Sequence, residues 1–184
     1  MIWSRRRLLK AGGATACVSA AGLLARPARS MQSSAAPKRI ALKNLHTDEA
    51  LEVEFFRDGV YVPDALASID LLLRDFRTGE RHAIDPKLMD YLVKVAHEAG
   101  VDPTFSVISG YRSLKTNAHL REQSTGVAQH SLHIEGRAID VRMSGIDCAS
   151  LATRAEDLQR GGVGYYRASN FVHLDTGAFR TWKG

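Results

Sequence analysis

Cysteine is scarce in this chain of 184 residues, which contains only Cys17 and Cys148. Cys17 falls in a segment that we expect to be removed, so the mature protein would keep one thiol and no intramolecular disulfide. Its stability must then come from a hydrophobic core, which a chain of this length can build in one main domain. Cys148 is expected in the first turn of a helix without a catalytic motif, so we interpret it as buried rather than as a nucleophile.

Positive charge is also scarce once the first thirty residues are set aside. The whole chain has 25 Lys+Arg against 20 Asp+Glu, a formal net charge of +5. Residues 1–30 hold six of the basic residues and none of the acidic ones, which leaves 19 minus 20, or −1, for the remainder. A domain without a basic excess is not expected to bind nucleic acid.

The chain offers no long hydrophobic run. The uncharged residues 11–24 are few and glycine-rich for a membrane span. They follow the basic segment Ser4-Arg-Arg-Arg-Leu-Leu-Lys10 and precede Ala28-Arg-Ser30, whose small residues suit a signal peptidase. The paired arginines resemble a twin-arginine export signal, which would deliver the mature protein to the periplasm without a membrane anchor. We therefore expect a signal peptide over 1–30, a linker over 31–38 and one monomeric domain over 39–184.

The expected elements follow one another in mixed order, without internal repeats. Short or alternating apolar runs predict strands at 39–45, 51–56, 105–109, 138–143, 164–166 and 171–175, and helical spacing predicts helices at 63–76, 86–99, 113–121 and 148–159. Asp85, Ser113 and Asp147 are placed to cap helices, and Gly100 and the pair Gly161-Gly162 to end them. Strands and helices do not alternate regularly, so we predict an α+β fold with a small antiparallel sheet and flanking helices.

Two potential metal ligands, His133 and Asp140, stand seven residues apart. Gly136 lies between them and lets the loop turn sharply, which would bring Asp140 on the next strand back towards His133. His173 follows on another strand. Two imidazoles and one carboxylate suit Zn²⁺ and leave a fourth position for water, as in catalytic zinc sites. Spacing alone leaves an alternative open, because such pairs arise by chance and His173 could be an ordinary strand histidine.

More specific information comes from three stretches: Ser109-Gly-Tyr-Arg-Ser-Leu-Lys-Thr-Asn117, Gln129-His-Ser-Leu-His133 and Gly161-Gly-Val-Gly-Tyr-Tyr-x-x-Ser-Asn-Phe-Val-His173. Together they resemble the YcbK-like murein endopeptidase branch of the zinc D-alanyl-D-alanine carboxypeptidase superfamily. The resemblance covers nearly all of residues 39–182. It implies a fold like the hedgehog signalling domain and the D,D-peptidases.

The resemblance also implies roles for particular residues. His133, Asp140 and His173 would hold the zinc ion, and a zinc-activated water would cleave peptidoglycan cross-links between two diaminopimelate residues. Arg112 would contact the substrate and stabilise the developing oxyanion, a task that suits a permanently charged fork of donors. A structural salt bridge is the alternative for Arg112.

The general base is not identified by the resemblance. In the carboxypeptidase branch a carboxylate stands three residues before the last histidine, and here that position is Asn170, which cannot accept a proton as a base. His130 and Asp175 are the candidates, with Glu135 a weaker one. Asp175 could instead orient His173, and His130 could instead hold its loop in place.

Two other functions are compatible with the sequence. One is a D,D-carboxypeptidase or dipeptidase that trims stem peptides and leaves cross-links intact. The other is a non-catalytic, zinc-containing module that binds peptidoglycan, which the asparagine in place of the usual base suggests.

Overall fold

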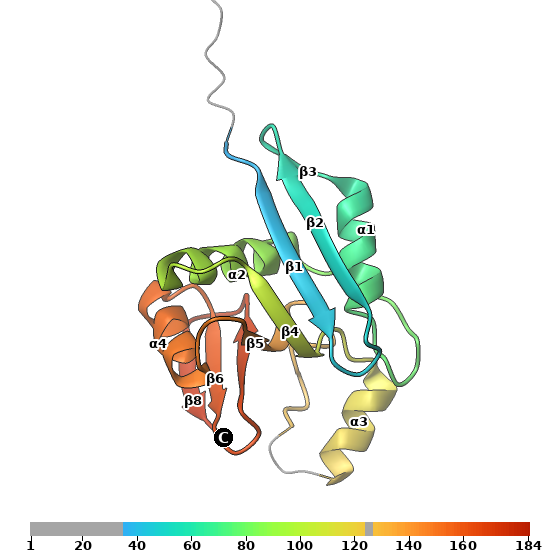
Figure 1. The fold of residues 1–184 in the computed structure, drawn as a ribbon. Helices are drawn as coiled ribbons and strands as arrows, with labels where there is room; N and C mark the ends of the chain where they lie inside the picture. Colours follow the sequence, from blue (N-terminus) through green and yellow to red (C-terminus); the bar gives the residue numbers. More distant parts are fainter. Residues whose placement is uncertain (1–34, 124–126) are drawn as a thin grey trace, which may run out of the picture. The chain divides into compact units, whose positions relative to one another are not determined.

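The computed structural model of the chain describes residues 35–123 and 127–184, which build one sheet with helices on it (Figure 1). The expected signal peptide at residues 1–30 lies outside the described residues. Within the described ranges, no helix combines the length and the apolar character that crossing a membrane requires.

The sheet contains eight strands in the order β3-β2-β1-β4-β5-β7-β6-β8. The strands are β1 (Lys38–Asn44), β2 (Ala50–Arg57), β3 (Val60–Tyr61), β4 (Thr104–Ser109), β5 (Ala138–Met143), β6 (Gly162–Tyr166), β7 (Phe171–Asp175) and β8 (Arg180–Lys183). The helices are α1 (Pro63–Leu72), α2 (Pro86–Ala99), α3 (Leu114–Gln123) and α4 (Cys148–Leu158).

The α+β class is confirmed, but the sheet is larger than predicted and is not wholly antiparallel. β1 pairs with β4 in parallel, as β6 does with β8, and the remaining pairs are antiparallel. The two edge strands, β3 and β8, were not predicted. They are two and four residues long, too short to show the alternation by which a strand is recognised.

The predicted helix caps are present. Asp85 accepts a hydrogen bond from the Lys87 amide at 3.0 Å, and Asp147 accepts one from the Ser150 amide at 2.9 Å. Gly100 ends α2 in the left-handed conformation, with φ +68°.

Two predicted helix ends were wrong. α1 stops at Leu72 rather than continuing to residue 76, because the carboxylate of Asp75 accepts the Arg77 amide and bends the chain into a turn. The pair Gly161-Gly162 does not end α4. Gln159 does so with φ +51°, and Gly162 already belongs to β6.

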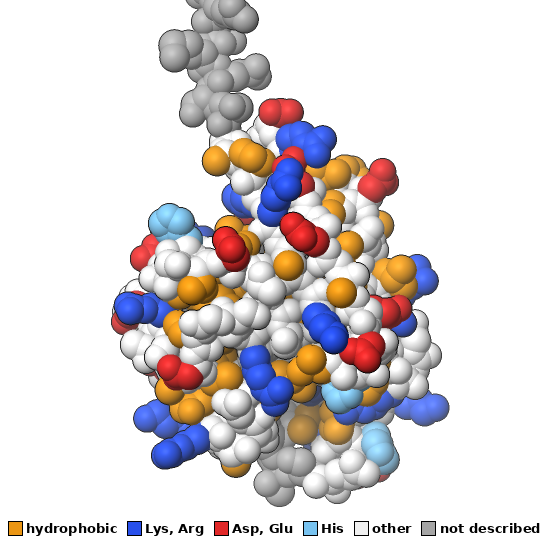
Figure 2. Space-filling view, in the orientation of Figure 1, with side chains coloured by type: hydrophobic (Ala, Val, Ile, Leu, Met, Phe, Trp, Pro, Cys, Tyr) orange, Lys and Arg blue, Asp and Glu red, His pale blue; other side chains and the backbone are white. Residues whose placement is uncertain are grey.

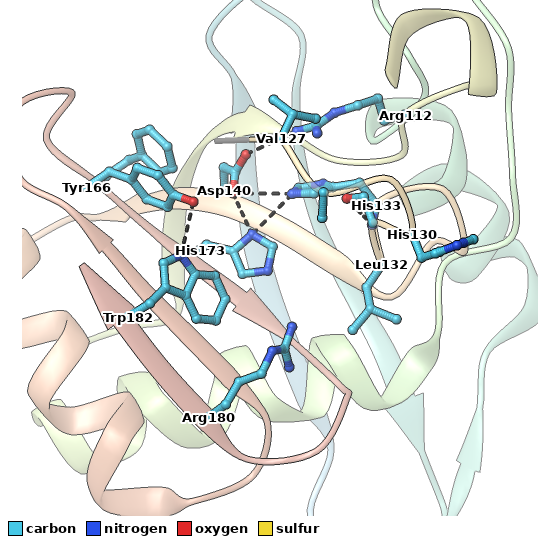
Figure 3. Close-up of a pocket in the computed structure, with 13 residues that line it drawn as sticks. Arg112, Val127, His130, Leu132, His133, Asp140, Tyr166, His173, Arg180 and Trp182 are labelled. Atoms are coloured by element: carbon cyan, nitrogen blue, oxygen red, sulfur yellow. Dashed lines mark hydrogen bonds and ion pairs between the residues drawn. The ribbon is translucent and has the colours of Figure 1, made fainter. Parts of the chain in front are cut away.

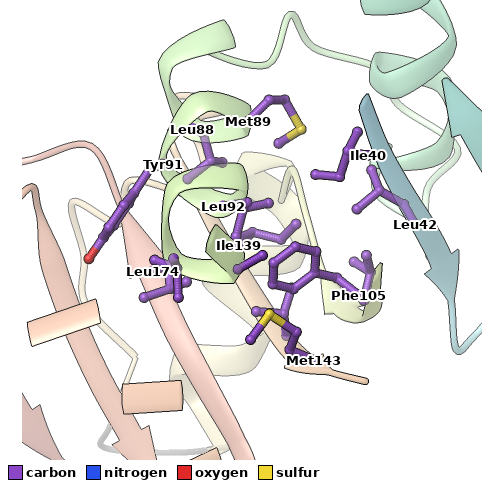
Figure 4. Close-up of a cluster of buried hydrophobic side chains, with 14 of the residues drawn as sticks. Ile40, Leu42, Leu88, Met89, Tyr91, Leu92, Phe105, Ile139, Met143 and Leu174 are labelled. Carbon is purple, nitrogen blue, oxygen red and sulfur yellow. The ribbon is translucent and has the colours of Figure 1, made fainter. Parts of the chain in front are cut away.

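The hydrophobic core lies between one face of the sheet and the helices α1, α2 and α4 (Figure 4). Strands contribute Ile40, Leu42, Phe105, Ile139 and Leu174, and α2 contributes Leu88, Met89 and Leu92, all of them buried. The predicted alternation in β5 is confirmed, since Ile139, Val141 and Met143 join this core. Asp140 therefore points to the opposite face, which the helices of the core leave open for a site.

The surface carries charge of both signs. On the face shown in Figure 2, lysine and arginine side chains are interspersed with aspartate and glutamate. Several form ion pairs, such as Lys38 with Asp90 at 2.7 Å and Lys94 with Glu98 at 2.5 Å.

Candidate active site

Part of the site lies in one row across four neighbouring strands. Asp140 of β5 pairs directly with His173 of β7. His173 pairs in turn with Gly164 of β6, which pairs with Trp182 of β8. Paired positions of adjacent strands share one face of a sheet, so the register alone brings the Asp140 carboxylate to the His173 imidazole.

His133 reaches this row from the turn before β5. Gly136 has φ +66°, and a Cβ atom there would collide with the carbonyl of Ala83, so the turn needs glycine on both counts. The chain is pinned on either side of the turn: the Asp85 amide donates to Gly136 at 2.9 Å, and the Arg112 amide donates to the His133 carbonyl at 3.1 Å. The predicted sharp turn at Gly136 is confirmed.

Three potential ligand atoms converge where these elements meet (Figure 3). Asp140 Oδ1 lies 2.9 Å from His173 Nδ1 and 3.3 Å from His133 Nε2, and the two nitrogens are 3.2 Å apart. Zinc–ligand bonds of about 2.1 Å at tetrahedral angles would place two ligand atoms roughly 3.4 Å apart. All three residues are buried, and both their spacing and their donor types fit a divalent metal such as zinc.

Each imidazole has its second nitrogen held by a fixed acceptor. His133 Nδ1 donates to the Gly110 carbonyl at 2.7 Å, and His173 Nε2 donates to Asp175 Oδ2 at 3.0 Å. These bonds fix the orientation of each ring and leave the lone pairs of His133 Nε2 and His173 Nδ1 facing Asp140. Carbonyls and carboxylates orient metal-binding histidines in the same way.

The electrostatics also suit a cation. Burial lowers the pKa of His133 and keeps its imidazole neutral. Burial opposes the charge of Asp140, but the neighbouring imidazoles outweigh this effect and lower the pKa of its carboxyl. Burial would likewise lower the pKa of His173, yet hydrogen bonds to Asp140 and Asp175 raise it to about 9. A metal that binds near neutral pH would therefore displace a proton from His173.

Asp175 lies behind His173 and outside the pocket. Its carboxylate is fully buried and accepts hydrogen bonds from the amides of Gly162 and Gly177 at 3.0 and 2.8 Å, besides His173 and Arg180. A carboxylate that already accepts this many bonds has no oxygen to offer a water in the pocket. The geometry favours the orienting role over the role of general base.

Arg112 borders the cluster on the side of Asp140. Its Nη2 atom is 3.6 Å from Asp140 Oδ2, and its buried Nε has no hydrogen-bond partner among the described residues. The oxygen of the Asn117 side chain is at the limit of hydrogen-bond distance, 3.5 Å from Nη1. An arginine with unused donors beside the candidate ligands can bind an oxygen of a substrate.

The ligand cluster includes neither His130, the other main candidate for the base, nor Asn170, which stands where the carboxypeptidases have theirs. His130 is exposed and lines the rim of the pocket, where its ring points away from the three ligand atoms (Figure 3). Asn170 lies in the turn between β6 and β7, with φ +51°, a conformation that asparagine tolerates better than most residues. Its position is explained by this turn, and it does not line the pocket.

Sequence reasoning missed three residues that form the wall of the pocket beyond His173: Tyr166, Arg180 and Trp182. The Trp182 indole lies 5.1 Å from the His173 ring and donates to the Tyr166 hydroxyl at 3.0 Å. It can lie there because Gly164 has no side chain, and a Cβ atom would collide with the indole. Arg180 and Trp182 lie on the unpredicted strand β8. The sequence gives one indication of them: Gly164 lies inside a predicted strand, and a glycine there can mark a place where another group approaches closely.

The arrangement of the site defines a class of protein. A buried His-Asp-His cluster in an accessible pocket, with an arginine beside it, is the arrangement that metal-dependent hydrolases use. Residues 32–182 match the family described as peptidoglycan L,D-endopeptidase MepK, and the chain belongs to this family.

The chain is similar to curated members of the family over nearly its whole length. It is 40% identical to the peptidoglycan L,D-endopeptidase MepK of Escherichia coli strain K12 over 179 residues, which are 97% of each chain. It is also 40% identical to the Haemophilus influenzae protein named "Probable peptidoglycan L,D-endopeptidase MepK", over 98% of this chain and 96% of that one. The predicted resemblance to murein endopeptidases is confirmed. No solved structure matches the chain significantly.

Proposed function

We propose that this protein is a zinc-dependent peptidoglycan endopeptidase that cleaves the cross-link between two diaminopimelate residues. The observation that carries the proposal is the convergence of His133 Nε2, His173 Nδ1 and Asp140 Oδ1 within 3.3 Å, in a chain of the MepK family. When bound, zinc would supply Lewis-acid polarisation of the scissile carbonyl and a water of lowered pKa.

The residues of the chain would then have distinct tasks. His133, Asp140 and His173 hold the metal, while the Gly110 carbonyl and Asp175 fix the two imidazoles. Arg112 meets the oxygen that gains charge in the transition state, because its Nη2 atom lies beside the cluster, 3.6 Å from Asp140 Oδ2.

We propose His130 as the residue that accepts and returns the proton. It is the histidine of this pocket that lies outside the proposed ligand set, and Asp175 is occupied by its own hydrogen bonds. Contacts of a catalytic base are often long in a protein without substrate and shorten when the substrate binds.

The test is hydrolysis of defined muropeptide dimers by the zinc-loaded mature protein, residues 31–184, with product masses as the readout. Dimers cross-linked through two diaminopimelate residues should yield two monomers, and dimers cross-linked through D-alanine should remain intact. Asp140→Ala should lose both zinc and hydrolysis, while the matched exposed control Asp157→Ala keeps both. Intact dimers, despite bound zinc and normal substrate binding, would refute the proposal. Loss of a terminal D-alanine with cross-links intact would indicate a carboxypeptidase.

We also propose that residues 1–30 export the folded protein to the periplasm. Support comes from the arginine pair in Ser4-Arg-Arg-Arg-Leu-Leu-Lys10 and from the peptidoglycan named in the relatives' descriptions. Replacing Arg5 and Arg6 by lysine should leave the precursor in the cytoplasm of a host with this export route, as cell fractionation would show. Continued export of the double variant would contradict a twin-arginine signal.

A further inference from the structure

Arg180 of β8 brings a second guanidinium to the candidate active site. It lines the same pocket as Arg112 and His173, and in Figure 3 its head group points from β8 into that pocket. Its side chain is 47% exposed. A substrate in the pocket can therefore reach it.

Several contacts hold this guanidinium in one place. Nη1 and Nη2 donate to the two carboxylate oxygens of Asp175 at 3.1 and 2.6 Å, and Nη1 also donates to the Ala178 carbonyl at 3.1 Å. The guanidinium carbon lies 5.1 Å from the Trp182 ring. Gly162 makes room for the pair, because a Cβ atom there would collide with Asp175 and with Arg180. A cation fixed in this way loses little freedom when it binds a ligand.

The same contacts leave one edge of the guanidinium available. Of the five N–H groups of an arginine, the three hydrogen bonds above use three. Nε–H and the second N–H of Nη2 have no recorded acceptor within residues 35–123 and 127–184. These two bonds lie parallel on one edge of the guanidinium, the geometry that takes both oxygens of a carboxylate.

We propose that Arg180 binds a free carboxylate on the substrate residue that supplies the nitrogen of the scissile amide, an inference that rests on the proposed function. When one amino group of diaminopimelate is acylated in a cross-link, the carboxylate on the same carbon remains free, two bonds from the scissile nitrogen. Arg180 is suited to bind this carboxylate because it lies close to the proposed metal ligands: Asp175 Oδ2 accepts hydrogen bonds from both Arg180 and His173. Arg112, on the other side of the cluster, is left for the carbonyl oxygen.

This assignment makes Arg180 a determinant of specificity. A primary amide in place of the carboxylate offers one acceptor oxygen and turns N–H groups towards the donors of Arg180, so one arginine donor loses its partner. Sites built to hydrogen-bond a substrate group reject analogues that lack it, because their own polar groups are then left unpaired.

The experiment compares two cross-linked peptides that differ only in whether this carboxylate is free or amidated. Zinc-loaded wild type, Arg180→Gln and the exposed control Arg154→Gln are assayed for kcat and KM on both peptides, with bound zinc measured for each protein. Binding of the two amine-side product peptides is measured by calorimetry. Wild type and Arg154→Gln should favour the free carboxylate by at least about tenfold, mainly in KM and in product affinity. Arg180→Gln should lose this preference and keep its zinc.

Three results would overturn the inference: no preference in the wild type, a preference that survives in Arg180→Gln, or an equal loss on both peptides together with lost zinc. The last would show that Arg180 acts only by positioning Asp175 and His173. The calorimetric arm separates the two proposals. Discrimination between product peptides without hydrolysis would sustain the carboxylate site and refute the endopeptidase activity.

Discussion

His130 and the three proposed ligands differ in what their loss should do. His130 lies on the rim of the pocket and away from the ligand atoms. We expect His130→Asn to retain zinc while kcat falls by about 100-fold, as is usual when a general acid–base group is lost. Metal analysis and steady-state kinetics check this, with His97→Asn on the exposed side of α2 as the control. Full activity of His130→Asn would assign the proton transfer to another group.

Asp175 provides the complementary case, because it touches His173 and not the pocket. Asp175→Asn removes the negative charge that orients the imidazole, so we expect zinc affinity to fall by about 10- to 100-fold. Competition with a chelator of known affinity measures this, and Asp157→Asn on α4 is the matched control. Unchanged zinc affinity with abolished turnover would instead make Asp175 the base.

At the scale of secondary-structure elements, the wall of the pocket depends on how closely β8 approaches β6. Gly164→Ala places a methyl group where the Trp182 indole lies, so β8 must shift. We expect a loss of about 1–3 kcal/mol in the free energy of unfolding, the usual range for overpacking. The same substitution should cost clearly less in a Trp182→Leu background, where the indole is absent. Equal costs in denaturant unfolding of the two backgrounds would show that β8 does not constrain this site.

Hydrogen bonds to Asp75 join the loop after α1 to the start of α3. Burial would raise the pKa of Asp75, but hydrogen bonds from Thr116, Ser113 and Arg77 outweigh it and lower the pKa to about 2, from an ordinary 3.8. A depressed carboxyl pKa stabilises the fold above the unfolded-state value, and this contribution is lost as the pH falls towards 2.

Asp75→Asn should therefore lower the free energy of unfolding at pH 7 by about 2 kcal/mol, and the difference from wild type should shrink between pH 4 and pH 2. Denaturant unfolding across this pH range measures it. A difference that stays constant with pH would mean that the charge of Asp75 contributes nothing.

The sequence predicted those parts of the site that local patterns encode. The alternation of β5 placed Asp140 opposite the core, and Gly136 between the ligands predicted the turn that carries His133. Arg180 and Trp182 could not be predicted, because β8 is an edge strand of four residues whose position depends on pairing with β6. Residue type left Asp175 open as a base or as an orienting group, and only its own hydrogen bonds favour the orienting role.

At the scale of the whole molecule, the proposed ligands tie together two neighbouring strands of the sheet, β5 and β7, and the loop before β5. Because β5, β7 and the loop before β5 all supply a ligand atom, zinc should bind the folded chain and not the unfolded one. At a free concentration about 1,000 times its Kd, zinc should raise the free energy of unfolding by about 4 kcal/mol. Unfolding with and without a chelator tests this, and Asp140→Ala should remove the effect. Identical curves for wild type would argue against a bound metal.

Because Asp140 pairs directly with His173, the site forms only in one strand register and is lost when the register shifts by one residue. Along β7, Val172 and Leu174 point into the core and His173 points away, so inserting one residue in this strand would exchange the two sets. The backbone ladder could re-form, but an imidazole would enter the core and a valine or leucine would face Asp140. Insertions and deletions in these strands should therefore abolish metal binding outright, whereas substitution of Arg180 on β8 should, by the proposal above, change which substrate is preferred and leave the ligands in place.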